Sequence, residues 1–272
     1  MCYAALVDTE LRRVMLDHML AAVEATVVYG NPSPHVIVRK FFPQDTYSRL
    51  LESLPSAADY EPFAYEKHAN EDGESNRKRF RLENDCLETL PNEDRVFWHT
   101  VRSALGSTAL KEAMFHKLRA SLSYRFKCKP EEVRALPGFA LPELFHETSG
   151  YCIKPHPDTR KKVVTMQIAL PEKDDQEHLG TELYRRSMRP ACWLRKPKGF
   201  EIVKTMPFLP NTAFAFVVLN TIRIKSWHGR SSLSSTCGLR NSLLNIWYRS
   251  AEHANTEILE ENQSLTELPK AA

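Results

Sequence analysis

Hydrophobic residues recur at helical spacing through much of the first half of the chain. The pattern runs from residue 4 to residue 28 and again from residue 94 to residue 127, which predicts amphipathic helices in both segments. A shorter helix is predicted at about 44–54, where Asp45 is placed to act as its N-cap. Residues 35–38 are rich in β-branched side chains, so they predict a short strand.

The pattern changes near residue 137. From there, Pro and Gly separate short segments whose hydrophobic residues alternate with a period near two, as they do in strands. Strands are predicted at residues 150–154, 163–170, 181–185, 200–206, 213–219 and 240–249. Short strands in this number predict a double-stranded β-helix, the cupin-like jelly roll, with supporting N-terminal helices. The predicted fold class is therefore mainly β with α.

These segments divide the chain into three regions. We expect a supporting helical region at 1–135, a jelly-roll core at 136–250 and a frayed tail at 251–272, with the whole chain forming one domain. With 272 residues, of which 42% are hydrophobic, the chain can bury a substantial core and does not have a disordered composition.

The formal net charge is only +3. A charge this small for the length argues against a dedicated nucleic-acid-binding protein, so a small-molecule partner is expected and nucleic acid is not. The basic run at 77–81 lies within a polar stretch, 56–90, that predicts a loop with short elements. The run itself is expected to be a solvated turn or helix face.

The sequence does not predict a membrane or secreted protein. No apolar run approaches the roughly 18 residues of a membrane span, and charged residues interrupt the N-terminal segment where a signal core would lie. The six cysteines form no C-x-x-C pair and are scattered through a chain that needs no disulfides to fold. We therefore predict a cytoplasmic protein, and the sequence leaves its oligomeric state open.

Two histidines and one aspartate are candidate metal ligands. His156 and Asp158 flank Pro157, so both side chains turn to the same face of an extended segment. His228 follows far downstream, after further predicted strands. Two imidazoles and a carboxylate are the ligands of non-heme ferrous enzymes, which keep open positions on the metal. The remaining histidines have no such partner pattern and are expected in core or surface roles.

A second group of candidate residues follows His228 along the chain. Arg240 and Ser242 point to one face of the last predicted strand, which apolar residues continue. An arginine inside an apolar barrel needs an anion. The distal carboxylate of 2-oxoglutarate is one candidate, and a protein Asp or Glu is the other. Thr165 and Gln167 share one face of an earlier strand and are candidates for the same pocket.

From about residue 141 to residue 248, the sequence resembles the Fe(II)/2-oxoglutarate-dependent dioxygenase superfamily, and in particular its bacterial small-molecule hydroxylases. The pattern of that superfamily is H-x-D, then a distal histidine, then a basic residue shortly afterwards, often as Arg-x-Ser. These elements stand in this sequence as His156, Asp158, His228, Arg240 and Ser242.

The resemblance implies an enzyme that uses Fe(II), the cosubstrate 2-oxoglutarate and O2. The two histidines and Asp158 would hold iron, and Arg240 would bind the distal carboxylate of 2-oxoglutarate. The reaction would release succinate and CO2 and hydroxylate an unactivated C–H bond of an amino acid or a natural-product intermediate in biosynthesis. Because Asp158 is present, no position is free for the halide that related halogenases bind.

Substrate contacts in this superfamily come from loops at the barrel mouth and from the N-terminal region. The candidates here are Arg79, Arg81, Tyr151, Trp227 and Arg230. A surface charge or a packing aromatic is the competing interpretation for each of them.

Other interpretations remain open. A cupin-type metal enzyme without 2-oxoglutarate would share the barrel, but such enzymes usually present more histidine ligands and have no use for Arg240 and Ser242. The same metal site also supports desaturation or cyclisation. A non-catalytic protein on a decayed oxygenase scaffold is a third possibility, and the intact ligand set argues against it.

Overall fold

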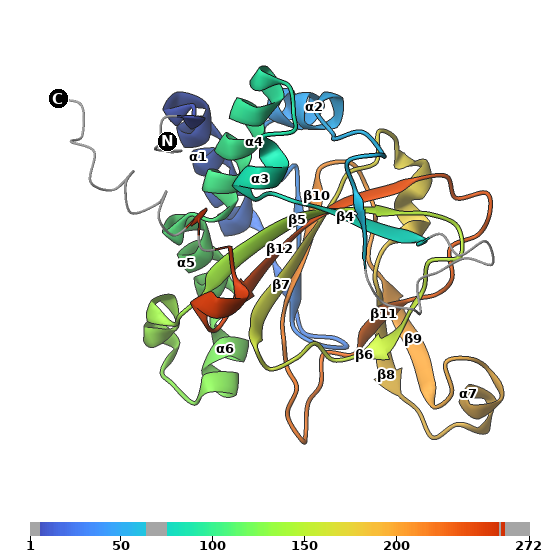
Figure 1. Cartoon of the computed structure of the whole chain (residues 1–272). Coiled ribbons are helices and arrows are strands. Elements are labelled where there is room, and N and C mark those ends of the chain that lie inside the picture. Colours follow the sequence, from blue (N-terminus) through green and yellow to red (C-terminus); the bar gives the residue numbers. More distant parts are fainter. Residues whose placement is uncertain (1–5, 64–74, 256, 259–272) are drawn as a thin grey trace.

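Two antiparallel sheets form the centre of the computed structural model, which describes residues 6–63, 75–255 and 257–258 (Figure 1). The larger sheet has the strand order β1-β2-β10-β7-β12-β5-β4-β3, and the smaller has the order β6-β11-β8-β9. The larger sheet comprises β1 (Val28–Tyr29), β2 (His35–Arg39), β3 (Glu61–Pro62), β4 (Arg77–Arg81), β5 (Phe139–Glu147), β7 (Lys162–Ala169), β10 (Thr212–Val217) and β12 (Arg240–Tyr248). The smaller comprises β6 (Ile153–His156), β8 (Glu182–Arg186), β9 (Phe200–Thr205) and β11 (His228–Arg230). The predicted jelly-roll core is confirmed.

Most helices gather on one side of the larger sheet, and the smaller sheet lies on the other side (Figure 1). The helices are α1 (Thr9–Ala25), α2 (Gln44–Glu52), α3 (Asn84–Leu87), α4 (Asn92–Leu105), α5 (Thr108–Lys117), α6 (Arg119–Phe126) and α7 (Pro190–Leu194). Short 3-10 turns lie at Pro130–Ala135, Asp174–Leu179 and Ala251–His253. Among the described residues, no helix combines the length and the apolar character that a membrane span requires.

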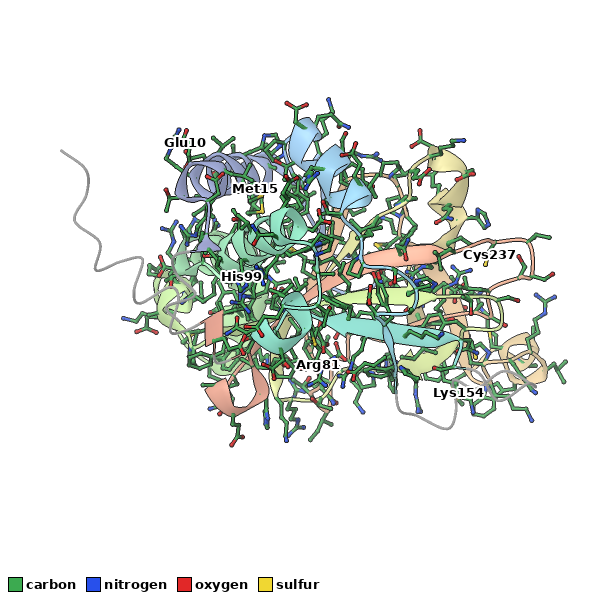
Figure 2. All side chains as sticks on the ribbon, turned by 45° about the horizontal axis from the view of Figure 1, so that its top comes forward. Glu10, Met15, Arg81, His99, Lys154 and Cys237 are labelled. Carbon is green, nitrogen blue, oxygen red and sulfur yellow. The ribbon has the colours of Figure 1, made fainter. Side chains whose placement is uncertain are left out.

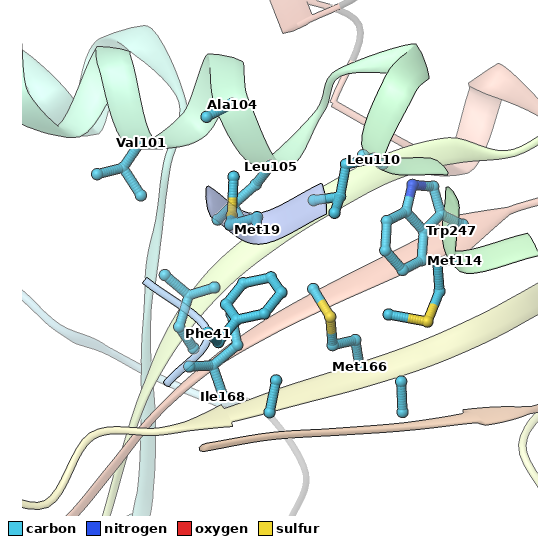
Figure 3. Packing of buried hydrophobic residues seen from close by; sticks show 14 of the residues in the cluster. Met19, Phe41, Val101, Ala104, Leu105, Leu110, Met114, Met166, Ile168 and Trp247 are labelled. Carbon is cyan, nitrogen blue, oxygen red and sulfur yellow. The ribbon is translucent and has the colours of Figure 1, made fainter. Parts of the chain in front are cut away.

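The main hydrophobic core lies between these helices and the larger sheet (Figure 3). Strand alternation sends the two faces of β10 into different clusters. Ala213 and Ala215 face the helices, whereas Phe214 and Phe216 join Leu183 of β8 in a second cluster. A strand that is buried on both faces reads as a continuous apolar run, which is how residues 213–219 appear in the sequence. Each large side chain buried in this way contributes about 1.5–3 kcal/mol.

The helical pattern at 94–127 is divided among three helices rather than one. The first break follows Leu105. Ser107 is extended (φ −63°, ψ 142°), and its hydroxyl accepts a hydrogen bond from the backbone N–H of Leu110 as the N-cap of α5. A Cβ at Gly106 would lie 2.1 Å from Cγ2 of Ile258, so the glycine admits that side chain. The uninterrupted apolar pattern hid these breaks because all three helices pack on the same sheet.

The predicted N-cap of α2 is wrong. Pro43 holds the N-cap position and makes no side-chain cap bond, and Asp45 lies in the first helical turn. The carboxylate still favours the helix from there, because it faces the positive end of the helix dipole. The predicted first helix is also shorter than expected. It ends at Ala25, because Val28 pairs with Val36 as part of β1.

The basic run at 77–81 is a strand rather than the expected solvated turn or helix face. It forms β4, which pairs with β5 from Arg77 opposite Glu147 to Arg81 opposite Glu143. Alternation places its arginines on one face and Phe80 in the helix-side core, so acidic partners on neighbouring strands replace solvent. The first half of the chain therefore contributes strands to the larger sheet as well as helices. Most of the expected tail at 251–272 lies outside the described residues.

Candidate metal centre and its pocket

Three potential metal ligands meet where the smaller sheet faces the larger one. His156 ends β6 and His228 begins β11, and the two residues are directly opposed in an antiparallel pair. Asp158 lies in the turn that leads from β6 into β7. Its Oδ1 is 3.9 Å from Nε2 of His156, and its Oδ2 is 3.8 Å from Nε2 of His228. One ligand atom from each residue falls within 4.8 Å of the other two, so the fold brings together the predicted ligand set.

Backbone hydrogen bonds fix both imidazole rings. Nδ1 of His156 donates to the carbonyl oxygen of Lys154, and Nδ1 of His228 donates to that of Ser226, each at 2.9 Å. Because Nδ1 carries the proton in both rings, Nε2 offers its lone pair on the side of Asp158. Hydrogen bonds of this kind orient metal-binding histidines and set their tautomer.

The surroundings keep His228 and Asp158 in the protonation state that a metal requires. Burial lowers the pKa of His228 to about 4, against the opposing effect of the Asp158 carboxylate. Burial alone would raise the pKa of Asp158, but His228 and Lys162 hold it below its usual range, helped by hydrogen bonds from Lys162 and Thr165, each at 2.7 Å. Metal ligands must be deprotonated, and two neutral imidazoles with one carboxylate fit Fe(II).

A cavity of about 110 Å³ lies beside the three ligands, between the two sheets. Arg240, Thr165 and Gln167 line it, as the sequence predicts. Ser242 is fully buried behind this surface, where its Oγ accepts a hydrogen bond from Nε2 of Gln167 at 3.3 Å. The apolar part of the wall comes from both β10 and β12 and consists of Phe214, Phe216, Leu244 and Ile246.

A row of three charges crosses one wall of the pocket. Glu147 of β5 lies directly opposite Arg77 of β4 on one side and opposite Arg240 of β12 on the other. Both guanidinium groups pair with its carboxylate, which is buried. Arg240 also donates to the carbonyl oxygen of Leu179 at 2.8 Å. The protein carboxylate that was the alternative partner for Arg240 is therefore present, but two arginines share it.

The five predicted substrate-binding residues fall into two groups in the structure, one that lines the pocket and one that does not. Tyr151 and Arg230 line the pocket. Trp227 does not line it and packs against Phe200. Arg79 and Arg81 also lie outside the pocket lining, because both pair with Glu61 on β3. In Figure 2, Arg81 lies nearer to the helices than Lys154 of β6 does.

Two charged pocket residues were missed by the sequence analysis. Arg77 lines the cavity, with its guanidinium 4.2 Å from the ring centroid of Phe145 and 5.2 Å from that of Tyr151. Lys162 lines it next to Asp158. The signal for Arg77 was its period-two spacing with Arg79 and Arg81, because residues with this spacing share one face of a strand. Interpreting the run as a helix or turn ignores that signal.

No protein family model matches the chain, and no curated protein matches its sequence. Solved structures do match. A prolyl-4-hydroxylase from Pseudomonas putida is 12% identical, with a TM-score of 0.49 over 85% of this chain and 99% of that one. A prolyl hydroxylase from Trichoplax adhaerens is 10% identical, with a TM-score of 0.49 over 94% of each chain. An oxidoreductase of the 2OG-Fe(II) oxygenase family from Burkholderia pseudomallei is 13% identical, with a TM-score of 0.43 over 88% and 92%. These are oxygenases of the superfamily that the sequence motifs resemble. At such identities the likeness concerns the fold, so the function is argued from the site.

Proposed function

We propose that this protein is a non-heme Fe(II)/2-oxoglutarate-dependent oxygenase. It hydroxylates an unactivated C–H bond of a small molecule, such as an amino acid or a natural-product intermediate, and releases succinate and CO2. The observation that carries the proposal is the convergence of His156, Asp158 and His228 beside a cavity that Arg240 also lines. A ligand set of this kind with open positions is typical of ferrous oxygenases.

In this proposal, the chain's own residues hold and orient the metal. His156 and His228 present Nε2, because their Nδ1 atoms are tied to backbone carbonyls. Lys162 and Thr165 hold the Asp158 carboxylate in place. When bound, Fe(II) would supply the oxidising chemistry at the expense of 2-oxoglutarate and O2. The protein's contribution is then position, charge and exclusion of water by the apolar wall of the pocket.

The charge row favours an anionic cosubstrate. Arg77 and Arg240 share the single carboxylate of Glu147, so these three residues leave one positive charge unmatched at the pocket wall. A buried charge of this kind is costly until an anion neutralises it. The distal carboxylate of 2-oxoglutarate fits, because a guanidinium binds a carboxylate through two parallel hydrogen bonds. Thr165 and Gln167 would complete the polar lining, whereas Ser242 lies behind it and would act only through its hydrogen bond with Gln167.

Substrate would enter beside Tyr151 and Arg230, which share the cavity with the metal ligands. We do not carry Arg79, Arg81 and Trp227 forward as substrate contacts, because their side chains do not line the cavity. The proposed oxygenase core is 136–250 with 1–135 in support, and the proposed location is the cytoplasm.

Two alternatives stay in the proposal. Desaturation or cyclisation would use the same site and differ only in the product. A cupin-type enzyme without 2-oxoglutarate would use the metal ligands but not the unmatched positive charge beside Arg240.

Anaerobic titration of the purified protein with Fe(II) and then 2-oxoglutarate tests the proposal. We expect a weak visible metal-to-ligand charge-transfer band that requires both additions. A protein that binds Fe(II) and does not respond to 2-oxoglutarate would favour the cupin alternative. A protein that binds no Fe(II) would refute the metal site. A panel of small molecules, screened by succinate release and product mass, then separates the insertion of one oxygen atom from the loss of two hydrogens.

A further inference from the structure

Two adjoining basic grooves cross the surface next to the loop that carries Asp158. The first has a volume of about 660 Å³ and is lined by residues 124–127, Arg160, residues 220–223 and Arg249. In Figure 1, α6 and the loop between β10 and β11 lie toward the same lower edge of the molecule. Residues of both segments line the first groove. The second groove, of about 590 Å³, shares Tyr124 and Arg223 with the first.

The first groove concentrates positive charge without compensation. Its cations are Arg125, Lys127, Arg160, Arg223 and Arg249, and no acidic side chain among the described residues lines it. None of the described acidic residues forms a salt bridge with any of these five cations. The whole chain has a formal net charge of only +3, so positive charge is segregated into this groove. A surface of one sign lining a concave wall raises the local concentration of ions of the other sign.

Arg125 shows most clearly that the positive charges in this groove lack a counter-ion. Among the described residues, its guanidinium donates to backbone carbonyls alone, those of Val163 at 3.1 Å and Arg160 at 2.8 Å. Burial, together with the charges of Arg249 and Arg160, lowers the pKa of Arg125 to about 10. A half-buried guanidinium that faces other cations is stabilised when an anion binds among them.

Aromatic rings lie among the cations in the lining of both grooves. Tyr124 is 48% exposed and belongs to both. In the second groove, the cations Arg186 and Lys225 lie over the ring of Trp227, at 5.5 and 5.3 Å from its centroid. Positive charges that track a backbone, interleaved with aromatic faces on which bases stack, are the physical requirements for binding single-stranded nucleic acid or other nucleotides.

The first groove is joined to the proposed metal loop by hydrogen bonds. Nδ2 of Asn220 donates to the backbone carbonyl of Asp158 at 3.1 Å, and Nε of Arg160 donates to the carbonyl of Asn220 at 2.9 Å. Asn220 and Arg160 both line the groove. A ligand that lies in the groove therefore contacts the segment that carries a proposed metal ligand.

We propose that these grooves bind nucleotide phosphates, with arginines holding the phosphates and Tyr124 stacking on a base. Two sources share this chemistry: a single-stranded oligonucleotide, and a small molecule that carries a nucleoside diphosphate. The proposal departs from the expectation that the small net charge set. It stands independently of the oxygenase assignment, because the grooves lie outside the cavity beside the metal ligands.

Fluorescence anisotropy of a labelled 12-nucleotide oligothymidylate, with unlabelled UDP-glucose and inorganic phosphate as competitors, tests the proposal without Fe(II) or 2-oxoglutarate. The variant Arg223→Gln/Arg249→Gln should bind the probe about tenfold or more weakly, because charge-assisted contacts are lost. Its slope of log K against log salt should fall by about 1.4, or ~0.7 for each lost phosphate contact. Tyr124→Ala should weaken binding roughly 5- to 100-fold through lost stacking.

The matched control is Arg39→Gln/Arg134→Gln, which removes the same charge from exposed positions that line neither groove. Tighter binding of the oligothymidylate than of UDP-glucose would identify the polymer as the source, and the reverse would identify the diphosphate conjugate. Equal losses in the groove and control variants would overturn the proposal, as would no binding of either nucleotide. Competition by inorganic phosphate as effective as that by UDP-glucose, with no loss in Tyr124→Ala, would also overturn it. Circular dichroism of each variant checks that it is folded.

Discussion

Glu147→Gln tests the charge row directly. The substitution preserves the size of the side chain and removes the one carboxylate that Arg77 and Arg240 share. Without its proposed ligands, the variant keeps two buried guanidinium groups that lack a counter-ion. Breaking a buried ion pair from one side costs about 3–5 kcal/mol. In a chain of this size, each kcal/mol moves Tm by ~2–4 °C, so we expect a fall of roughly 6–20 °C.

The same substitution should strengthen binding of 2-oxoglutarate. In the proposed complex of the wild type, the distal carboxylate approaches a guanidinium that already faces a protein carboxylate. Two negative charges ~6 Å apart at an effective dielectric constant of ~20 repel by about 3 kcal/mol. Rearrangement of the arginines reduces this value, so we expect the Kd for 2-oxoglutarate to fall about tenfold. Saturating 2-oxoglutarate should then return part of the lost stability, ~2.7 kcal/mol at a hundredfold excess over Kd.

The measurements are urea unfolding with and without 2-oxoglutarate and anaerobic titration of the charge-transfer band. Glu143→Gln is the matched control. Glu143 lies on the same strand and is also buried, but it pairs with Arg79 and does not line the pocket. If Glu147→Gln weakened binding of 2-oxoglutarate, Glu147 would be a residue that orients Arg240, and the idea of an unmatched charge would be refuted.

Three further outcomes test the site and the fold. Asp158→Ala should abolish succinate release and weaken Fe(II) binding by tenfold or more (~1.4 kcal/mol), measured by metal retention after dialysis, and normal succinate release with substrate present would contradict the metal assignment. Arg240→Ala should raise the concentration of 2-oxoglutarate needed for half-maximal turnover far more than that of Fe(II), and an unchanged cosubstrate requirement would make the arginine part of the scaffold. Ser107→Ala should lower the free energy of unfolding by about 1 kcal/mol in urea because the N-cap of α5 is lost, and a change near zero would show that packing alone defines that boundary.

The three proposed metal ligands could be singled out from the sequence because the pattern that they form is local and rare. The spacing of His156 and Asp158 brings both side chains to one face of an extended segment, and the second histidine begins a later strand. Period-two alternation placed Arg240 on the pocket face of its strand in the same way. Such patterns depend only on the geometry within a single strand, so they can be read from the sequence.

The partners of those residues were decided by the tertiary structure. Glu147 faces Arg240 only because β5 lies beside β12, and Arg77 joins them only because β4 pairs with β5 from the other side. The basic groove is likewise assembled from α6, the loop after Asp158, the β10–β11 loop and the end of β12. The net charge is a sum over the whole chain, so it does not indicate where positive side chains cluster on the surface. The order of strands and the proximity of loops depend on how the apolar faces of many helices and strands are buried together. No single segment of the sequence carries that information.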